Sequence, residues 1–197
     1  MPKGISLTEE SKSIKRKHIA EAAKSLFLKN GYQNTSMHSI AEVVHAGKSS
    51  LYDYFSTKDE ILLLILESYI DDLITSSQEI DKQVISPKEK LRLILLNHMR
   101  YLWNTRSFLA LLTVEIQRMD ALRQRKFQIK RKSYLDLISN VIREGIIQKN
   151  FINDIDPDLT ANIALAITSP SVVGGISPES ADKQFESIMT IFLKGIS

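Results

Sequence analysis

The amino-acid sequence predicts an all-α protein with about nine helices, in which a three-helix helix-turn-helix domain precedes a larger helical domain. Three observations lead to this prediction. Apolar residues recur every three or four positions in one segment after another, which is the period of an α-helix. Capping residues, prolines and glycines separate these segments. No segment shows the apolar–polar alternation of a convincing strand.

The composition excludes several classes of site and location. The chain of 197 residues has no cysteine, so disulfides and thiolate metal sites are excluded, and its four histidines show no ligand spacing. The longest uninterrupted apolar run, residues 61–66, is far too short to span a bilayer, and the first residues lack the apolar core of a signal peptide. We therefore expect a cytoplasmic protein with no metal, no cofactor and no membrane partner.

The charge is unevenly distributed along the chain. Residues 12–58 hold eight basic and three acidic residues, which gives +5, whereas the whole chain carries +3. A basic N-terminal quarter suggests a polyanionic partner such as nucleic acid. The alternative is that the lysines only solvate a helix surface.

The first helix is predicted from about residue 12 to residue 30. Gly31 follows it, at a position where helices often end in a left-handed residue. Thr35 and Ser36 offer an N-cap for the next helix. The apolar stripe of the first helix consists of Ile19, Ala22, Ala23, Leu26 and Phe27.

Residues 38–55 predict a helix-turn-helix. The first short helix has an apolar face at helical spacing, formed by Met37, Ile40, Ala41 and Val44. The second, from Lys48 to Phe55, would be about 12 Å long, which matches the width of the DNA major groove. Its Leu51 and Phe55 would face inward, with Lys48, Ser49 and Tyr52 on another side. The alternative is an ordinary helical corner with solvated polar residues.

The remaining chain predicts further helices and no strand. The pair Thr57 and Glu60 forms a capping box, and the apolar run that follows predicts burial on every side. Ser86-Pro87, Asp156-Pro157 and Ser177-Pro178 are also helix starts. The expected ranges are about 57–80, 86–105, 108–119, 121–148, 157–169 and 178–196.

A run of basic residues occupies the end of one predicted helix and the start of the next. It is open to two interpretations, an auxiliary surface for phosphates or a solvated helix face, and charge runs on helices are usually solvated. The run consists of Arg118, Arg123, Arg125, Lys126, Lys130, Arg131 and Lys132.

Residues 14–66 resemble the DNA-binding domain of the tetracycline-repressor (TetR) family of bacterial transcriptional regulators. The resemblance is carried by IAEAAKSLFLKNGYQNTSM, SIAEVV and above all KSSLYDYFSTKDEIL. It implies a DNA-binding domain at 12–58 and a ligand-binding and dimerisation domain at 59–197. It further implies a homodimer that binds a palindromic operator in double-stranded DNA as a repressor and is released by a small-molecule effector.

The resemblance also assigns residues to the DNA interface. His38 matches a base-contacting position, and Tyr52, Tyr54 and Lys58 match positions that reach phosphate. Leu51 and Phe55 match core positions. The full predicted set is Thr35, Ser36, His38, Gly47, Lys48, Ser49, Ser50, Tyr52, Tyr54 and Lys58.

Three residues depart from the family pattern. His45 stands where the family usually has a turn glycine, and Gly47 stands where a capping polar residue is more common. Asp53 stands where a neutral or aromatic residue is common. Its carboxylate would repel phosphate, so we expect it either to turn toward a lysine or arginine or to tune specificity.

The C-terminal part is predicted to hold an effector pocket and a dimer interface. The pocket candidates are Tyr69, His98, Met99, Trp103, Phe108 and Met119, which would suit a hydrophobic or aromatic effector and would otherwise be core residues. The last two helices are capped and amphipathic, so we expect them to pair with a second copy. The predicted interface consists of Leu159, Ile163, Ile167, Phe185, Ile188, Met189 and Phe192.

Two other function classes remain as alternatives. An enzyme would need a recognisable catalytic motif, and none of the common nucleophile, phosphate-loop or zinc signatures occurs. An all-helical adaptor or small-molecule-binding protein without DNA binding would share the fold but would fail to shift duplex DNA on a gel at low salt.

Overall fold

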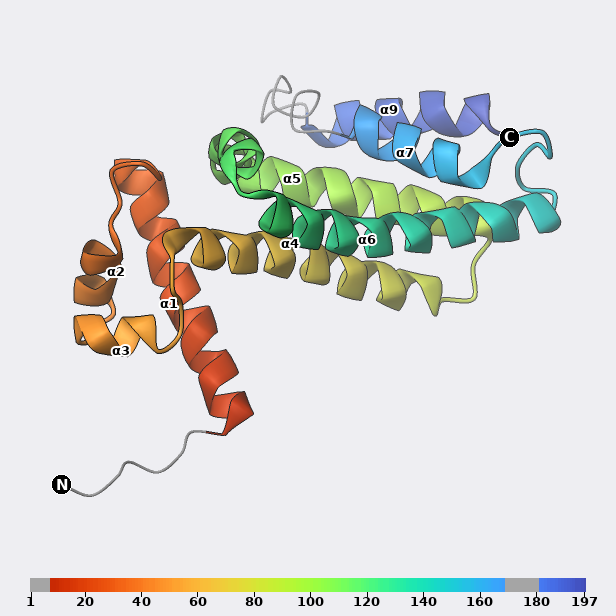
Figure 1. Cartoon of the computed structure of the whole chain (residues 1–197). Helices are drawn as coiled ribbons and strands as arrows, with labels where there is room; N and C mark the ends of the chain where they lie inside the picture. The colour runs from red at the N-terminus through yellow and green to blue at the C-terminus, as the bar shows by residue number, and fades with distance from the viewer. Residues whose placement is uncertain (1–7, 169–180) are drawn as a thin grey trace. The chain divides into compact units, whose positions relative to one another are not determined.

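The computed structural model describes residues 8–168 and 181–197, with the side chains of residues 48, 106, 107 and 109–113 outside the description. Within these residues every regular element is a helix, which confirms the predicted all-α class (Figure 1). The elements are α1 (Glu9–Asn30), α2 (Met37–Val43), α3 (Lys48–Tyr52), α4 (Lys58–Asp81), α5 (Pro87–Arg118), α6 (Ala121–Ile147), α7 (Pro157–Ile167) and α9 (Ala181–Gly195).

Three helix boundaries differ from the prediction. Helix α1 begins earlier, at Glu9, because Thr8 caps it by accepting a hydrogen bond from the Ser11 amide. Helix α3 has five residues rather than eight, since the chain turns after Tyr52. The break expected near residues 105–108 is absent. That stretch contains no glycine or proline to end the helix, so α5 continues.

The remaining boundaries lie close to those expected. Helix α6 covers almost all of the predicted 121–148, and α7 begins at the predicted proline. The expected start of the last helix at residue 178 lies outside the described residues, as do Ser169-Pro170 and Gly174-Gly175.

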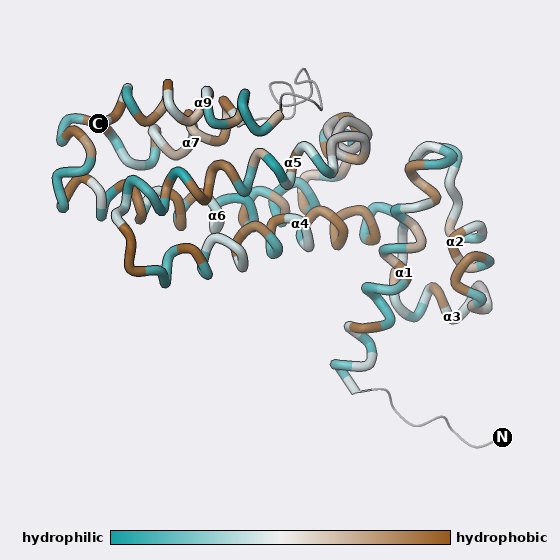
Figure 2. The backbone as a smooth tube through the Cα atoms, turned by 180° about the vertical axis from the view of Figure 1, so that it is seen from behind, coloured by the Kyte–Doolittle hydropathy of each residue, from teal (hydrophilic) through white to brown (hydrophobic). Residues whose placement is uncertain are grey.

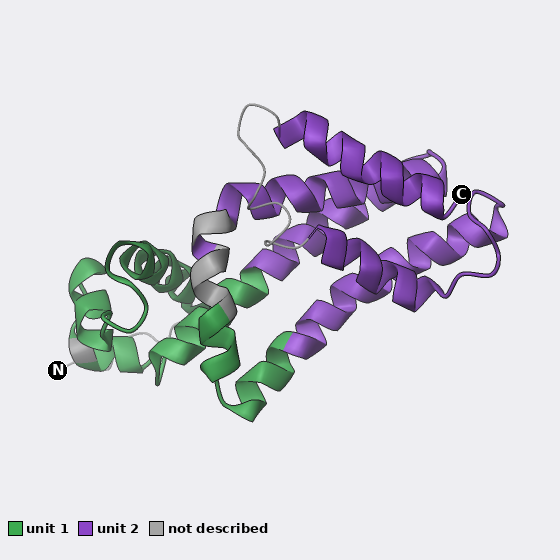
Figure 3. Ribbon diagram, turned by 90° about the horizontal axis from the view of Figure 1, so that it is seen from above, with its two compact units in different colours: residues 1–68, 111–127 green, residues 69–110, 128–197 purple. Residues whose placement is uncertain are grey.

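The chain divides into two compact units (Figure 3). Unit 1 consists of residues 1–68 and 111–127, and unit 2 consists of residues 69–110 and 128–197. This division differs from the single cut proposed at 58/59, because the first turns of α4 and the α5–α6 junction belong with the N-terminal helices. Helices α4, α5 and α6 therefore each contribute residues to both units.

The core of unit 1 joins the helix-turn-helix to α1 and to the start of α4. Ile40 of α2 and Leu51 of α3 are fully buried, and so are Ile19 and Phe27 of α1. The predicted all-round burial of the α4 run is confirmed, because only Leu64 within residues 61–66 is not classed as buried. The run is a continuous hydrophobic stretch near the beginning of α4 in Figure 2.

The core of unit 2 is built from α4, α5, α6, α7 and α9. Its fully buried side chains include Leu91, Met99, Ile138, Phe185 and Met189. Ion pairs tie α9 to α5: Arg92 to Glu186 at 2.8 Å and Arg100 to Asp182 at 3.0 Å. Ala181, Phe185, Met189 and Leu193 recur every four residues along α9 and are buried, so one face of this helix lies within the core of the unit. Hydrophobic and hydrophilic residues both occur along α9 in Figure 2.

The turn between α2 and α3 contains a strained residue. His45 has a φ of 49°, in the left-handed region that an L side chain enters at a cost of about 1–2 kcal/mol. The turn imposes this angle, since the amides of His45 and Ala46 bond back to Glu42 and Ala41 of α2. The departure of His45 from the family's glycine therefore has a measurable consequence.

We expect His45→Gly to stabilise the protein by about 0.5–1 kcal/mol, because relief of the strained φ exceeds the extra chain entropy of glycine. Urea unfolding of the variant beside the wild type measures this. His45→Ala keeps the Cβ atom and should give no such gain. A stabilisation by alanine equal to that by glycine would show that the histidine ring, and not the backbone angle, is the cause.

Candidate nucleic-acid interface

The two short helices of the helix-turn-helix are held by contacts at their ends. Ser36 caps α2 by accepting from the Ser39 amide, and the Ser39 side chain accepts from the Ser36 amide in return. Gly47 precedes α3 without a side-chain cap. A five-residue helix is too short to be stable alone, so α3 depends on the burial of Leu51 and of Phe55 just beyond it.

The predicted DNA-contacting residues divide into outward and inward groups. Tyr52 is 45% exposed, and His38 is exposed beside Glu42, with 3.4 Å between the imidazole Nε2 and the carboxylate. Ser49 is exposed, whereas Ser50 and Tyr54 are half-buried. The Lys48 side chain lies outside the described residues. The outward residues form a small polar surface on α2 and α3 that could approach base edges and phosphates.

Thr35 does not belong to this surface. It is 2% exposed, and its hydroxyl donates to the Gly31 carbonyl at 2.8 Å. A buried hydroxyl with an internal partner cannot reach DNA, so the prediction of Thr35 as a contact residue is wrong. Ser36 is exposed and remains a candidate. The sequence misplaced Thr35 because either residue of a Thr-Ser pair can be an N-cap.

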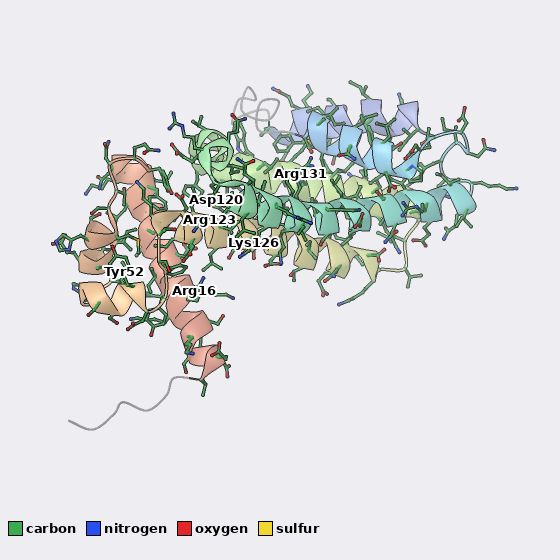
Figure 4. The ribbon with its side chains drawn as sticks, viewed as in Figure 1. Arg16, Tyr52, Asp120, Arg123, Lys126 and Arg131 are labelled. Atoms are coloured by element: carbon green, nitrogen blue, oxygen red, sulfur yellow. The ribbon has the colours of Figure 1, made fainter. Side chains whose placement is uncertain are left out.

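Arg16 of α1 was not predicted and supports the end of the recognition segment. Its guanidinium donates to the Tyr54 carbonyl and lies 4.0 Å from the centre of the Phe55 ring. The signal was present in the sequence, since Arg16 continues the stripe of Ile19 and Ala23 by one turn. Figure 4 labels Arg16 on α1 and Tyr52 on α3.

Lys58, predicted to reach phosphate, has a different set of partners. Its ammonium donates to the carbonyls of Tyr32 at 2.8 Å, Gln33 at 3.3 Å and Thr35 at 3.1 Å. It also lies 4.4 Å from the centre of the Tyr32 ring. An ammonium has three N–H donors, so all three are used within the protein. The geometry favours a role in holding the loop before α2.

Two further contacts fix the same loop. The Tyr32 hydroxyl donates to the Asp59 carboxylate, and burial followed by this bond raises the pKa of Tyr32 well above its usual value. The Gln33 amide donates to the buried Glu115 carboxylate at 2.7 Å. The loop from α1 to α2 is therefore bonded both to the start of α4 and to the last turns of α5, within unit 1.

Asp53 lies among cations. A cleft of about 460 Å³ in unit 1 is lined by the first turns of α1, by Asp53 and Tyr54, and by Leu64. Lys12, Arg16 and Lys17 are the basic residues of its wall. The Asp53 side chain is exposed near these basic residues, and its orientation toward one of them stays a prediction.

The basic run of α5 and α6 is largely paired. Arg118 bonds to Glu115, and Arg123 bonds to Asp120 and to Glu60 at the start of α4. Lys130 and Lys132 pair with Asp71 and Asp136. Figure 4 labels Arg123 and Asp120 near the beginning of α6, with Lys126 and Arg131 further along. Four of the seven cations therefore have carboxylate partners, which favours the solvated face over the phosphate surface.

Five of the six pocket candidates are buried and Trp103 is half-buried, and the six do not form one group. Tyr69 packs edge-on against Phe108, with ring centres 5.7 Å apart, and His98 stacks on Tyr134 at 5.5 Å. The ring centres of Trp103 and Phe185 lie 6.4 Å apart. Met99 is fully buried. Met119 is the exception, because it belongs to unit 1. The other five candidates lie in unit 2.

The predicted dimer residues fall into a buried group and an exposed group. Phe185 and Met189 are 1% and 0% exposed within the single chain, so they belong to its own core and we remove them from the interface. Leu159 and Ile163 of α7 are 60% and 46% exposed. Ile191, which was not predicted, is 74% exposed on α9. The exposed apolar surface of α7 and α9 also includes Ile167, Ile188 and Phe192, which line clefts at these helices.

No helix among the described residues has both the length and the apolar character needed to cross a membrane. No group of three or more His, Asp or Glu side chains among them is arranged to hold a metal ion.

Two family models match the chain, and their order agrees with the fold. Residues 19–65 match the model described as bacterial regulatory proteins, tetR family. Residues 84–171 match the tetracyclin repressor-like C-terminal domain. The chain belongs to the tetR family. It is a TetR transcriptional regulator, and the family contains regulators rather than enzymes.

Similar proteins span nearly the whole chain. A transcriptional repressor named KstR2 from Mycolicibacterium smegmatis is 25% identical over 195 residues, covering 96% of this chain and 94% of the relative. The fatty acid metabolism regulator protein of Bacillus subtilis is 25% identical over 137 residues, covering 70% and 71%. The solved structure of FadR from Bacillus subtilis with stearoyl-CoA has a TM-score of 0.78 at 20% identity, covering 92% and 99%. The last comparison bears on the fold of this TetR protein.

We expect Lys58→Met to lower the stability of this TetR regulator by about 1–3 kcal/mol, because three carbonyls lose a charged donor. Its affinity for duplex DNA should fall, while the slope of log affinity against log salt stays unchanged. Fluorescence anisotropy over a salt series measures both, with the exposed Lys29→Met as control. If the slope instead became shallower by about 0.9 with unchanged stability, Lys58 would be a phosphate contact.

Proposed function

We propose that this TetR-family protein is a ligand-responsive repressor that binds a palindromic operator as a homodimer in the cytoplasm and leaves it when a small molecule binds unit 2. The observation that carries the proposal is the helix-turn-helix of unit 1. Its apolar side is sequestered by Leu51 and Phe55, while His38, Ser49 and Tyr52 remain directed away from the core.

The charge of this region supports a nucleic-acid partner. Unit 1 presents the +5 segment of residues 12–58 together with the exposed polar side chains of α2 and α3. Side chains at the start of a recognition helix reach base edges, whereas those one turn later reach the backbone. We therefore assign base contacts to Lys48 and Ser49 and a phosphate contact to Tyr52.

The effector is proposed from unit 2 and from the relatives. FadR was solved with stearoyl-CoA, and KstR2 of Mycobacterium tuberculosis is described as a ketosteroid regulator. Both names refer to ligands with large apolar bodies. The buried aromatic residues of unit 2, among them Tyr69 and Phe108, would suit a ligand of that kind.

Duplex binding is expected to depend steeply on salt, with a slope of about −0.9 for each phosphate neutralised. Tyr52→Phe should weaken all duplexes to a similar degree, because it removes a phosphate donor. Leu51→Ala should instead lower stability by about 2–5 kcal/mol, because that side chain is fully buried. Affinities for a panel of duplexes at several salt concentrations, with unfolding curves, separate the two effects. Affinity that does not change with salt would contradict the proposal.

A homodimer through α7 and α9 is expected to dissociate when a charge enters its apolar surface. Ile191→Glu should shift the mass measured by light scattering at micromolar concentration from dimer to monomer. Val84→Glu is the matched control, because Val84 is fully exposed between α4 and α5 and belongs to neither helix. A wild-type protein that is monomeric, or an Ile191→Glu variant that remains a dimer, would place the interface elsewhere.

A further inference from the structure

The loop of residues 31–36 joins α1 to α2 and is bonded to both α4 and α5 within unit 1. Lys58 of α4 donates to three of its carbonyls. The Tyr32 hydroxyl donates to Asp59 of α4, and the Gln33 amide donates to Glu115 of α5 at 2.7 Å. Because these two neighbouring side chains are held by different helices, the contacts fix the orientation of the loop as well as its position.

Glu115 faces this loop from the last turns of α5, which belong to unit 1 (Figure 3). Burial and the bond to Asp59 raise the pKa of Tyr32, and the negative charges of Asp59 and Glu115 raise it further. The Glu115 carboxylate therefore lies close enough to act on the side chains of both Tyr32 and Gln33.

The burial of the Glu115 carboxylate is costly unless hydrogen bonds replace its lost hydration. Its side chain is 9% exposed, whereas that of its second partner, Arg118, is 61% exposed, with 3.2 Å between the guanidinium Nη1 and the carboxylate Oε1. An ion pair with so exposed a partner contributes little to stability. Stability alone would be served as well by an apolar side chain of similar volume. The carboxylate therefore points to a task that its directional bond to Gln33 fulfils.

The loop determines the direction in which α2 begins. Ser36, the N-cap of α2, is the last residue of the loop, and His38 lies in the first turn of the helix. With seven residues α2 is too short to be stable alone, so its placement depends on the loop and on the burial of Ile40. Helix α3 is anchored separately, by the burial of Leu51. A change in the loop should therefore move His38 more than it moves Ser49 of α3.

We propose that Glu115 is a positioning residue for operator recognition. Through the Gln33 amide it fixes the orientation of the loop and of the first turn of α2, and thereby the base preference of His38. Side chains that read a ligand need to be held within about 0.5 Å of the productive geometry by the residues behind them. The inference rests on the proposed function, since it concerns how the same helix-turn-helix reads its operator.

The test exchanges the two side chains. The duplex that the wild type selects from a random library is varied one base pair at a time, and His38→Ala identifies the position read from α2. Gln33→Glu places two carboxylates against each other and should reduce the preference at that position about fivefold, less than the full value of a good base contact. The double variant Gln33→Glu/Glu115→Gln should restore the preference, because the amide introduced at position 115 can donate to the carboxylate introduced at position 33 and still accept from Arg118.

Two controls separate positioning from stability. Arg118→Gln removes the other donor to Glu115 and should leave every base preference unchanged. Tyr101→Phe removes the hydrogen bond to Asp72 in unit 2, so it should lower the free energy of unfolding and leave every base preference unchanged. Affinities are measured by fluorescence anisotropy on the full chain, at a temperature at which unfolding curves show each variant to be folded.

Three results would contradict the inference. A double variant that does not recover the preference would mean that Gln33 itself contacts DNA. Equal losses at every base position, or none, in Gln33→Glu would mean that the bond to Glu115 does not position α2. A His38→Ala variant with unchanged base preference would mean that α2 reads no base.

Binding of the selected duplex by the wild type over a salt series is measured in parallel. If this binding is present while the exchange gives any of the contradicting results, the inference about Glu115 is wrong and the DNA-binding function stands. If the wild type binds no duplex, the proposed function itself fails.

Discussion

The burial of Leu51 and Phe55 in the core of unit 1 is the interaction on which the rest of that unit depends. Helix α3 has five residues and no side-chain cap, so it has no independent stability. Its conformation is fixed from behind by these two side chains, by the Arg16 guanidinium on Phe55 and on the Tyr54 carbonyl, and by the turn at His45. The exposed side chains of α3 are therefore not needed to hold the helix in place.

The cations of this region likewise fall into two groups, those that stabilise the fold and those that can bind phosphate. Arg16 and Lys58 have their donors directed at backbone carbonyls, and they order the two ends of the helix-turn-helix. Different cations remain available to bind phosphate, such as Lys17 in the wall of the cleft beside Asp53. Counting basic residues therefore overstates the charge available to DNA, because some of that charge supports the fold.

Periodicity predicted most of the fold and the inward faces of the short helices. Ile40, Leu51 and Phe55 were identified from spacing alone, because a helix with one apolar side must bury it. Spacing did not predict that α5 continues past residue 105, since Asn104 to Ser107 are polar but compatible with a helix. It also could not assign Lys58, whose partners lie more than twenty residues away in the sequence.

The two apolar sides of α9 illustrate the limit of this approach. Phe185 and Met189 form one stripe and Ile188 and Ile191 another, and only the fold shows that the first faces the protomer's own core. Sequence therefore indicates which residues form an apolar stripe, and the structure shows which stripe the protomer buries in its own core.

The central claim is that unit 1 reads duplex DNA as part of a two-fold dimer. Selection of bound sequences from a random duplex library, with the unmodified protein at physiological salt, tests it most directly. The account predicts an enriched inverted repeat whose half-sites are centred about one helical turn apart, 10–10.5 base pairs, or a multiple of it. Recovery of no enriched sequence, or of a single site without a repeat, would contradict it.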